Sequence, residues 1–136
     1  EAKRELVQKC GMEYSVNTKD TYDCVIEAVG TTQALEECLT LAAPGGRVVL
    51  MGNPDGDRTL PQNVYWSILR KQLTLTGTWN SSYGGSESDW QEAVQNAAEL
   101  CAERAISHIL PWDELDKGLA IMKDQTEPYC KIILEF

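Results

Sequence analysis

The sequence predicts an α/β fold with a mainly parallel β-sheet and helices on both faces of that sheet. Strand-like and helix-like segments alternate along the chain, which is the order expected of such a fold. The run RVVLMG, residues 47–52, is almost entirely apolar, and this is typical of a strand buried on both faces. Three strand-like segments end in small residues, at Gly30, Gly52 and Gly77. Each glycine alone is explained by a turn, but ligands bind outside the carboxyl ends of parallel strands, so three together predict a pocket.

The first expected element is a helix over residues 1–11, EAKRELVQKCG. Leu6, Val7 and Cys10 fall on one face of this helix, and Gly11 provides a C-terminal stop. No Ser, Thr, Asp or Asn precedes the helix to cap its first turn, and the chain does not begin with Met. We therefore expect this helix to be part of a longer chain.

Two strands are expected next, over residues 12–16 and 22–30. The second, YDCVIEAVG, is rich in residues that favour strands and ends at a glycine. The first, MEYSV, is separated from it by the short link Thr18 to Thr21. Those four residues reach roughly 14 Å at full extension, whereas a parallel crossover takes a dozen or more residues. MEYSV is therefore a strand, one arm of a hairpin, or a segment displaced from the sheet.

The remaining elements follow from periodicity and from capping residues. A helix begins after Thr31 or Thr32, either of which would cap it, and ends at Pro44-Gly45-Gly46 before the apolar strand. Further along we expect a helix over 60–71, a strand over 72–79, a loop over 80–88, a helix over 89–104, an extended segment over 105–111, a helix over 112–125 and a closing strand over 130–136.

Length and charge bound the function. A chain of 136 residues with 43% hydrophobic content suits one domain with one core. The formal charge of −9 argues against nucleic acid and anionic membranes as partners, because the field would repel phosphates. The sequence has no apolar run of about 20 residues and does not open with a signal peptide, so we expect a cytoplasmic protein without a membrane span.

Two residue types that bind metals are interpreted as structural. The five cysteines are odd in number, have no CxxC pair and fall mostly inside expected helices or strands, so buried thiols are favoured over a disulfide or zinc framework. His108, the single histidine, is favoured as a structural residue over a metal ligand.

Three ordered segments carry a resemblance to a known family. VIEAVG (25–30), APGGRVVLMGNP (43–54) and ILRKQLTLTGTW (68–79) resemble the cofactor-binding domain of the medium-chain dehydrogenases/reductases, the zinc alcohol and polyol dehydrogenases. The last segment is most similar to galactitol-1-phosphate and sorbitol-type dehydrogenases. The resemblance implies that residues 1–136 are a partial Rossmann-like domain lacking its first two strands, with 129–136 a closing strand toward an absent catalytic domain.

The resemblance implies a nicotinamide site at two strand ends. Met51, Gly52 and Asn53 match the strand end whose backbone meets the nicotinamide carboxamide. Gly77 and Thr78 match the next strand end, which closes that pocket, although the threonine is also explained as an ordinary strand hydroxyl.

The adenosine half and the pyrophosphate of the cofactor are matched by four further residues. Ala28 and Gly30 match the turn that flanks the adenosine half. Lys3 matches a basic residue near the adenosine ribose, and Lys131 matches one that can reach the pyrophosphate. Both lysines are also explained as solvated surface charges.

The family's reaction implies groups that this sequence lacks. Such enzymes oxidise a secondary alcohol, here a sugar alcohol or its phosphate, by hydride transfer to NAD or, in second place, NADP, and zinc in the catalytic domain polarises the alcohol oxygen. The glycine fingerprint G-x-G-x-x-G for the pyrophosphate is absent, and so are the zinc ligands. We therefore expect the isolated chain to be inactive. The alternatives are a non-catalytic module and the cofactor domain of a zinc-independent quinone-type reductase.

The family also implies a homodimer or a higher homo-oligomer. Its strands after the helix over 60–71 commonly pair across a two-fold axis. Trp66 and Trp79 would then lie near this contact, or alternatively they are buried core aromatics. An unpaired edge on the strand over 22–30 is a second surface that another copy of the chain would cover.

Overall fold

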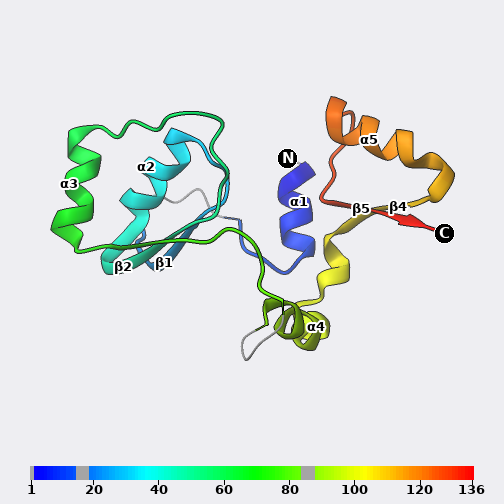
Figure 1. Ribbon diagram of the computed structural model, residues 1–136, viewed down its shortest axis with the longest axis horizontal. Helices are drawn as coiled ribbons and strands as arrows, with labels where there is room; N and C mark the ends of the chain where they lie inside the picture. Colours follow the sequence, from blue (N-terminus) through cyan, green and yellow to red (C-terminus); the bar gives the residue numbers. More distant parts are fainter. Residues whose placement is uncertain (1, 15–18, 84–87) are drawn as a thin grey trace. The chain divides into compact units, whose positions relative to one another are not determined.

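The chain forms two compact units, one of residues 16–80 and the other of residues 1–15 together with 81–136. The computed structural model describes residues 2–14, 19–83 and 88–136. Figure 1 shows helices and strands alternating within these ranges, and each strand ladder among them is parallel. The predicted α/β class with parallel pairing is confirmed, although the five described strands divide between a three-stranded and a two-stranded sheet. The expectation of one partial domain over residues 1–136 stays a prediction.

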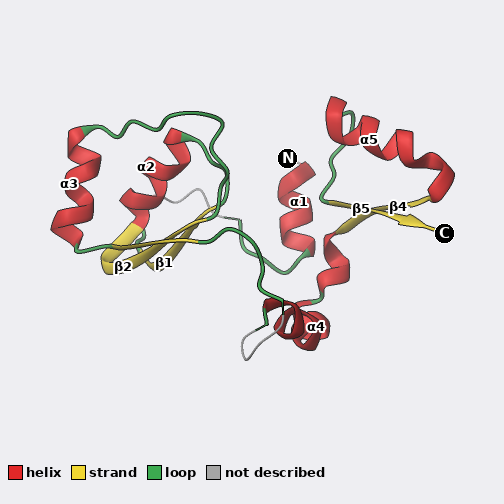
Figure 2. Cartoon of the chain, viewed as in Figure 1, coloured by secondary structure: helices red, strands yellow, loops and turns green. Residues whose placement is uncertain are grey.

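The unit of residues 16–80 is a βαβαβ arrangement. It contains β1 (Tyr22–Glu27), α2 (Thr32–Leu41), β2 (Ala42–Leu50), α3 (Gln62–Lys71) and β3 (Thr74–Gly77). The strands lie in the order β1-β2-β3, so both crossovers advance in the same direction across the sheet. Because such crossovers are right-handed, both helices must lie on the same face. Figure 2 shows α2 and α3 together on one side of the strands, where they contact each other.

The core of this unit lies between the sheet and its two helices. Leu39 of α2, together with Ala42 and Val48 of β2, is completely buried. Burial of a side chain such as leucine or valine contributes about 1.5–3 kcal/mol. The residues packed around this centre are Val25, Leu35, Cys38, Leu50, Leu60, Val64, Ile68 and Leu73.

The opposite face of the same sheet is open. Ile26 of β1 is 58% exposed and Arg47 of β2 is also exposed. The prediction that residues 47–52 are buried on both faces is therefore wrong. The apolar run reflects contact with the helices on one face, while the second face is solvated in this unit.

Local residue choices set the ends of α2. Thr31 is the N-cap, and its hydroxyl oxygen accepts a hydrogen bond from Ala34 N at 3.1 Å, which decides between the two predicted caps. The helix ends at Leu41 instead of continuing to Pro44-Gly45-Gly46, because Ala42 already has an extended backbone (φ −65°, ψ 133°) and begins β2.

The other unit carries the remaining elements. They are α1 (Ala2–Lys9), α4 (Asp89–Leu100), the 3₁₀ helix η1 (Ala102–Ala105), β4 (Ile106–Pro111), the 3₁₀ helix η2 (Trp112–Glu114), α5 (Leu115–Asp124) and β5 (Lys131–Glu135). Strands β4 and β5 pair in parallel and are joined through α5. Ile121 of α5 and Leu110 of β4 are buried, and a Cβ added at Gly118 would lie 3.5 Å from both Leu110 and Ile132. The small residue therefore lets the helix approach the strands closely.

The structure limits the alternatives that the sequence left open at two places. Residues 12–14 form no strand and are exposed, while the rest of MEYSV, Ser15 and Val16, lies outside the described residues. A three-residue segment without a neighbouring ladder has nothing to stabilise it as a strand. Trp66 and Trp79 are 43% and 76% exposed, so they are not core aromatics.

The cysteines are free thiols, and none is fully buried. Cys24 is exposed because it lies on the open face of β1, and Cys130 is exposed before the start of β5. The other three are partly buried. The prediction of buried thiols is therefore wrong for these two positions.

No helix among the described residues is long and apolar enough to cross a bilayer.

Candidate functional site

The three strands of the unit of residues 16–80 end level with one another. In the observed register Glu27 of β1 lies opposite Leu50 of β2, and Leu50 lies opposite Gly77 of β3. Because all three strands are parallel, their carboxyl ends form one edge, which we call the carboxyl edge. This confirms the predicted alignment of the three strand ends and puts their small residues where α/β proteins bind ligands.

Seven of the nine predicted site residues gather at the carboxyl edge. They are Ala28 and Gly30 after β1, Met51, Gly52 and Asn53 after β2, and Gly77 and Thr78 at the end of β3. Five of the seven are exposed; the exceptions are Gly30, which is buried, and Gly52, which is partly buried. The edge therefore presents residues of three strand ends to solvent.

Backbone hydrogen bonds join these strand ends. The carbonyl oxygen of Glu27 accepts from Met51 N and from Gly52 N, at 2.8 Å each. The carbonyl oxygen of Leu50 accepts from Thr78 N at 3.0 Å. The hydrogen bonding thus continues two residues past β2 and one residue past β3, which holds the edge in one shape.

The three glycines at the edge have different surroundings. A Cβ added at Gly52 would lie 2.2 Å from Gly30 N, and a Cβ added at Gly30, whose φ is +84°, would lie 2.4 Å from Asn53 O. These two glycines are therefore required by the close packing of one strand end against the next. A Cβ added at Gly77 would have no heavy atom within 4 Å. The space beside Gly77 is open to a ligand.

Two charged side chains at the edge, those of Glu27 and Arg58, were not predicted from the sequence. Glu27 is only 5% exposed, and its Oε1 accepts hydrogen bonds from Val29 N at 2.8 Å and from Gly30 N at 2.7 Å. Arg58 donates to the carbonyl oxygen of Gly30 through Nε, at 2.9 Å, and through Nη2. A glutamate directly after the apolar residues Val25 and Ile26, three residues before a glycine, is the sequence signal that would have indicated the first of them.

Arg58 also holds its own loop. Its Nη2 donates to Asp55 Oδ1 at 2.8 Å and its Nη1 donates to Asp57 O at 3.1 Å. The hydrogen bond from Arg58 is the main reason that the pKa of the Asp55 carboxyl lies below its ordinary value. Arg58 therefore links the loop after β2 to the turn after β1.

A small cavity lies behind these strand ends. Its volume is about 190 Å³, and it is lined by Glu27, Gly30, Thr31, Leu35, Leu50, Gly52, Pro54 and Arg58. Ligand pockets usually span about 300–1,000 Å³. The cavity is too small for a dinucleotide, so the exposed carboxyl edge, not this cavity, is the candidate site.

The two predicted lysines belong to the other unit. The side chain of Lys3 lies outside the described residues. Lys131 is the exposed first residue of β5. Their predicted roles at the ribose and the pyrophosphate stay predictions.

His108 lies in a hydrogen-bond network of the other unit. Its Nδ1 lies 2.9 Å from Ser107 Oγ, which donates to Lys131 O at 3.0 Å and accepts from Cys130 N at 2.9 Å. Because the single hydroxyl hydrogen is used toward Lys131, the ring Nδ1 must be the donor to Ser107. The ring Nε2 lies 3.6 Å from Glu127 Oε2. This network ties β4 to the start of β5, as a structural histidine would.

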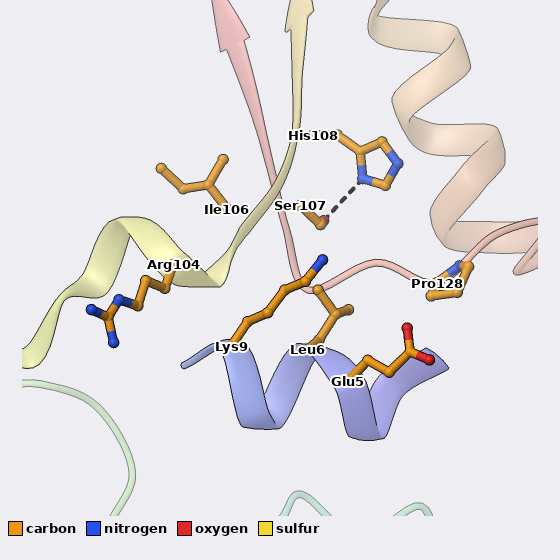
Figure 3. Close-up of a pocket in the computed structure, with 8 residues that line it drawn as sticks. All are labelled: Glu5, Leu6, Lys9, Arg104, Ile106, Ser107, His108 and Pro128. Atoms are coloured by element: carbon orange, nitrogen blue, oxygen red, sulfur yellow. Dashed lines mark hydrogen bonds between the residues drawn. The ribbon is translucent and has the colours of Figure 1, made fainter. Parts of the chain in front are cut away.

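The same histidine lines a pocket of about 300 Å³. Figure 3 shows this pocket between Glu5, Leu6 and Lys9 of α1 and residues of η1 and β4. The full lining is Glu5, Leu6, Lys9, Arg104, Ile106, Ser107, His108 and Pro128. Within the described parts of the chain, no group of three or more His, Cys, Asp and Glu side chains is placed to hold a metal ion.

Comparison with known sequences and structures gives a consistent result. A family described as "Zinc-binding dehydrogenase" matches residues 1–99. Galactitol 1-phosphate 5-dehydrogenase of Escherichia coli is 29% identical over 87 residues, which are 62% of this chain and 25% of that protein. The chain therefore spans a quarter of the length of this relative.

Solved structures extend the likeness over nearly the whole chain. A putative zinc-binding dehydrogenase from Clostridium scindens matches with a TM-score of 0.80 at 20% identity, over 98% of this chain and 40% of that one. A short chain alcohol dehydrogenase from Escherichia coli, solved with NADH, matches with a TM-score of 0.75 at 18% identity, over 100% of this chain and 42% of that one. At these identities the likeness shows the fold, and the expected Rossmann-like class is confirmed.

Proposed function

The chain belongs to the zinc-binding dehydrogenase family, and we propose that it forms part of the cofactor-binding domain of an alcohol or polyol dehydrogenase. The enzyme would transfer a hydride from a secondary alcohol, a sugar alcohol or its phosphate, to NAD. The observation that carries the proposal is the carboxyl edge, where three parallel strands end level with one another. NAD is proposed first and NADP second, and structural neighbours are solved with each of them, one with NADH and another with NADPH.

The nicotinamide end of the cofactor fits the β2 and β3 side of the edge. The open space beside Gly77 admits a flat ring, and the side chain of Met51, 52% exposed, offers an apolar surface next to it. Thr78 is exposed, so its hydroxyl group can reach a ligand, while its backbone N–H donates to Leu50 O. In this proposal the chain binds and orients the ring that receives the hydride.

Two other groups of the proposed reaction do not fit this chain. The sequence lacks the glycine fingerprint that cradles a pyrophosphate, and the described residues offer no cluster of metal ligands. Zinc, when bound elsewhere in the longer enzyme, would polarise the alcohol oxygen. We therefore assign no proton transfer or metal contact to these residues, and we expect the isolated chain to catalyse no oxidation.

Titration of the ¹⁵N-labelled chain with NAD⁺, followed by amide chemical shifts, tests the proposal. We expect shifts at Gly30, Gly52 and Gly77 with a dissociation constant of about 1 mM or weaker, because the pyrophosphate contacts are missing. The variant Gly77→Val, which fills the open space, should lose the response at β3. Shifts that avoid the carboxyl edge would contradict the site, and saturable micromolar binding would contradict the view that the pyrophosphate site is incomplete.

We also propose that the enzyme is a cytoplasmic homodimer. β3 is an edge strand of the described sheet and is exposed along its length, which leaves its outer side available for pairing with a second copy. Sedimentation of the chain at micromolar concentration tests this point. A stable monomer would contradict the dimer.

A further inference from the structure

The turn after β1 is held on both sides by side chains of opposite charge. Glu27 Oε1 accepts from Val29 N and Gly30 N, and Arg58 donates to Gly30 O from the other side. Both peptide groups that flank the Cα of Gly30 are therefore fixed by charge-assisted hydrogen bonds, which are about twice as strong as neutral ones. We call Glu27, Gly30 and Arg58 the Gly30 clamp.

The clamp fixes a conformation that the backbone alone would not keep. Gly30 has a φ of +84°, a region that glycine enters freely but also leaves freely. The clamp selects this conformation, and the neighbouring strand end then packs against it, since a Cβ added at Gly52 would lie 2.2 Å from Gly30 N. Ala28 and Val29 remain exposed beside it, at the outer surface of the edge.

The clamp meets the end of β2 at Gly52 and Asn53, but it does not involve the end of β3. Its hydrogen bonds run between the turn after β1 and the loop of Asp55 and Arg58 after β2. The hydrogen bonds of the clamp do not involve Gly77 or Thr78 at the end of β3, and Thr78 N instead donates to Leu50 O. A change in the clamp should therefore act mainly on the turn after β1 and least on the open space beside Gly77.

We propose that Glu27 and Arg58 are positioning residues for the adenosine half of the cofactor. This inference rests on the proposed function. The two side chains would hold the turn of Ala28, Val29 and Gly30 in the shape that the adenosine meets, without touching the cofactor. Their loss would weaken the adenosine contact and spare the nicotinamide contact.

The test uses the two halves of the cofactor as separate ligands. Adenosine 5′-monophosphate and nicotinamide mononucleotide are titrated against the ¹⁵N-labelled chain and its variants. Glu27→Met removes the acceptor but keeps an apolar side chain of similar length. Glu27→Gln is the matched control, because its amide oxygen still accepts from both N–H groups. Amide hydrogen exchange at Val29 and Gly30 is measured in parallel.

We expect Glu27→Met to raise the amide hydrogen exchange rates of Val29 and Gly30 at least tenfold. It should also raise the dissociation constant of adenosine 5′-monophosphate at least fivefold. Binding of nicotinamide mononucleotide should stay within twofold. Glu27→Gln should stay within threefold of the wild type in all measurements. Arg58→Met, at a side chain that is 21% exposed, is the second variant if Glu27→Met does not fold, and it should weaken the same half.

The outcomes separate this inference from the proposed function. If a variant binds both ligands equally more weakly, or binds both as well as the wild type, the positioning role is overturned, since a purely structural role predicts one of these results. A wild-type chain whose amides at the carboxyl edge shift with neither half nor with NAD⁺ itself would overturn the proposed function and with it the positioning role. The exchange rates would still show whether the clamp holds the turn.

Discussion

Lys71 should stabilise the unit of residues 16–80 more than any exposed basic residue of that unit. Its ammonium group donates to the carbonyl oxygens of Leu39, Thr40 and Ala42, at 3.1, 2.7 and 2.9 Å. These three acceptors use all three hydrogens of the group. The carbonyls of the last helical turn have no partner within a helix, so a cation from α3 satisfies the C-terminus of α2.

The substitution Lys71→Met keeps the length of the side chain and removes the donors. A hydrogen bond to a charged group contributes about 1.5–3 kcal/mol, and the carbonyl of Thr40 is exposed, so water replaces that bond. The hydrogen bonds to the carbonyl oxygens of Leu39 and Ala42 are partly buried, so water replaces them less well and their loss costs more free energy. We expect the free energy of unfolding of this unit to fall by about 2 kcal/mol.

Urea unfolding followed at the amides of Leu39 and Val48 measures this loss in the correct unit. With a slope of about 1–2 kcal/mol per molar urea for a small unit, the midpoint should fall by about 1–2 M. Arg47→Met is the control, because it removes the same charge from the same unit at an exposed side chain. Equal midpoints for the two variants would refute the role of the three hydrogen bonds.

Three further predictions follow from single contacts. Thr31→Ala should lower the free energy of unfolding by about 1 kcal/mol, as measured by urea unfolding, because Ala34 N loses its acceptor. Gly52→Ala should lower the unfolding midpoint sharply, whereas Gly77→Ala, with open space around it, should leave the midpoint nearly unchanged. Cys38 should react with a thiol reagent at pH 8 more slowly than the exposed Cys24. Burial, and then the nearby charges of acidic residues, raises the pKa of the Cys38 thiol, so a smaller fraction of it is the reactive thiolate. Equal labelling rates would contradict this.

The elements themselves could be predicted because their signals are local. Thr31 before an amphipathic run and Gly30 after a β-rich run mark their boundaries through the hydrogen bonds and torsions of a few neighbours. Even here the end of α2 was misjudged. The Pro-Gly-Gly segment indicates a helix end, but Ala42 leaves the helix earlier because Lys71, 29 residues further along, takes the carbonyls at that end.

Burial was predicted less well, because it depends on which face of the sheet is covered. Residues 48–51 are apolar on both faces, yet α2 and α3 cover one face of this unit and leave Ile26 exposed on the other. Cys24 of β1 was misjudged for the same reason. Composition shows that a side chain is apolar, but neighbours distant in the sequence decide whether it is covered.

The three glycines of the candidate site differ in their surroundings, and the sequence alone does not show this difference. All three are the same residue type in the sequence. At Gly30 and Gly52, however, the space that a Cβ atom would need is filled by backbone atoms of the neighbouring strand end. A ligand therefore gains access beside Gly77, while on the β1 side it meets a surface already closed by packing. On that side the shape of the turn is what a ligand would recognise, and Glu27 and Arg58 determine that shape. A glutamate at the end of β1 and an arginine from the loop after β2 thus fix this glycine of positive φ from two sides.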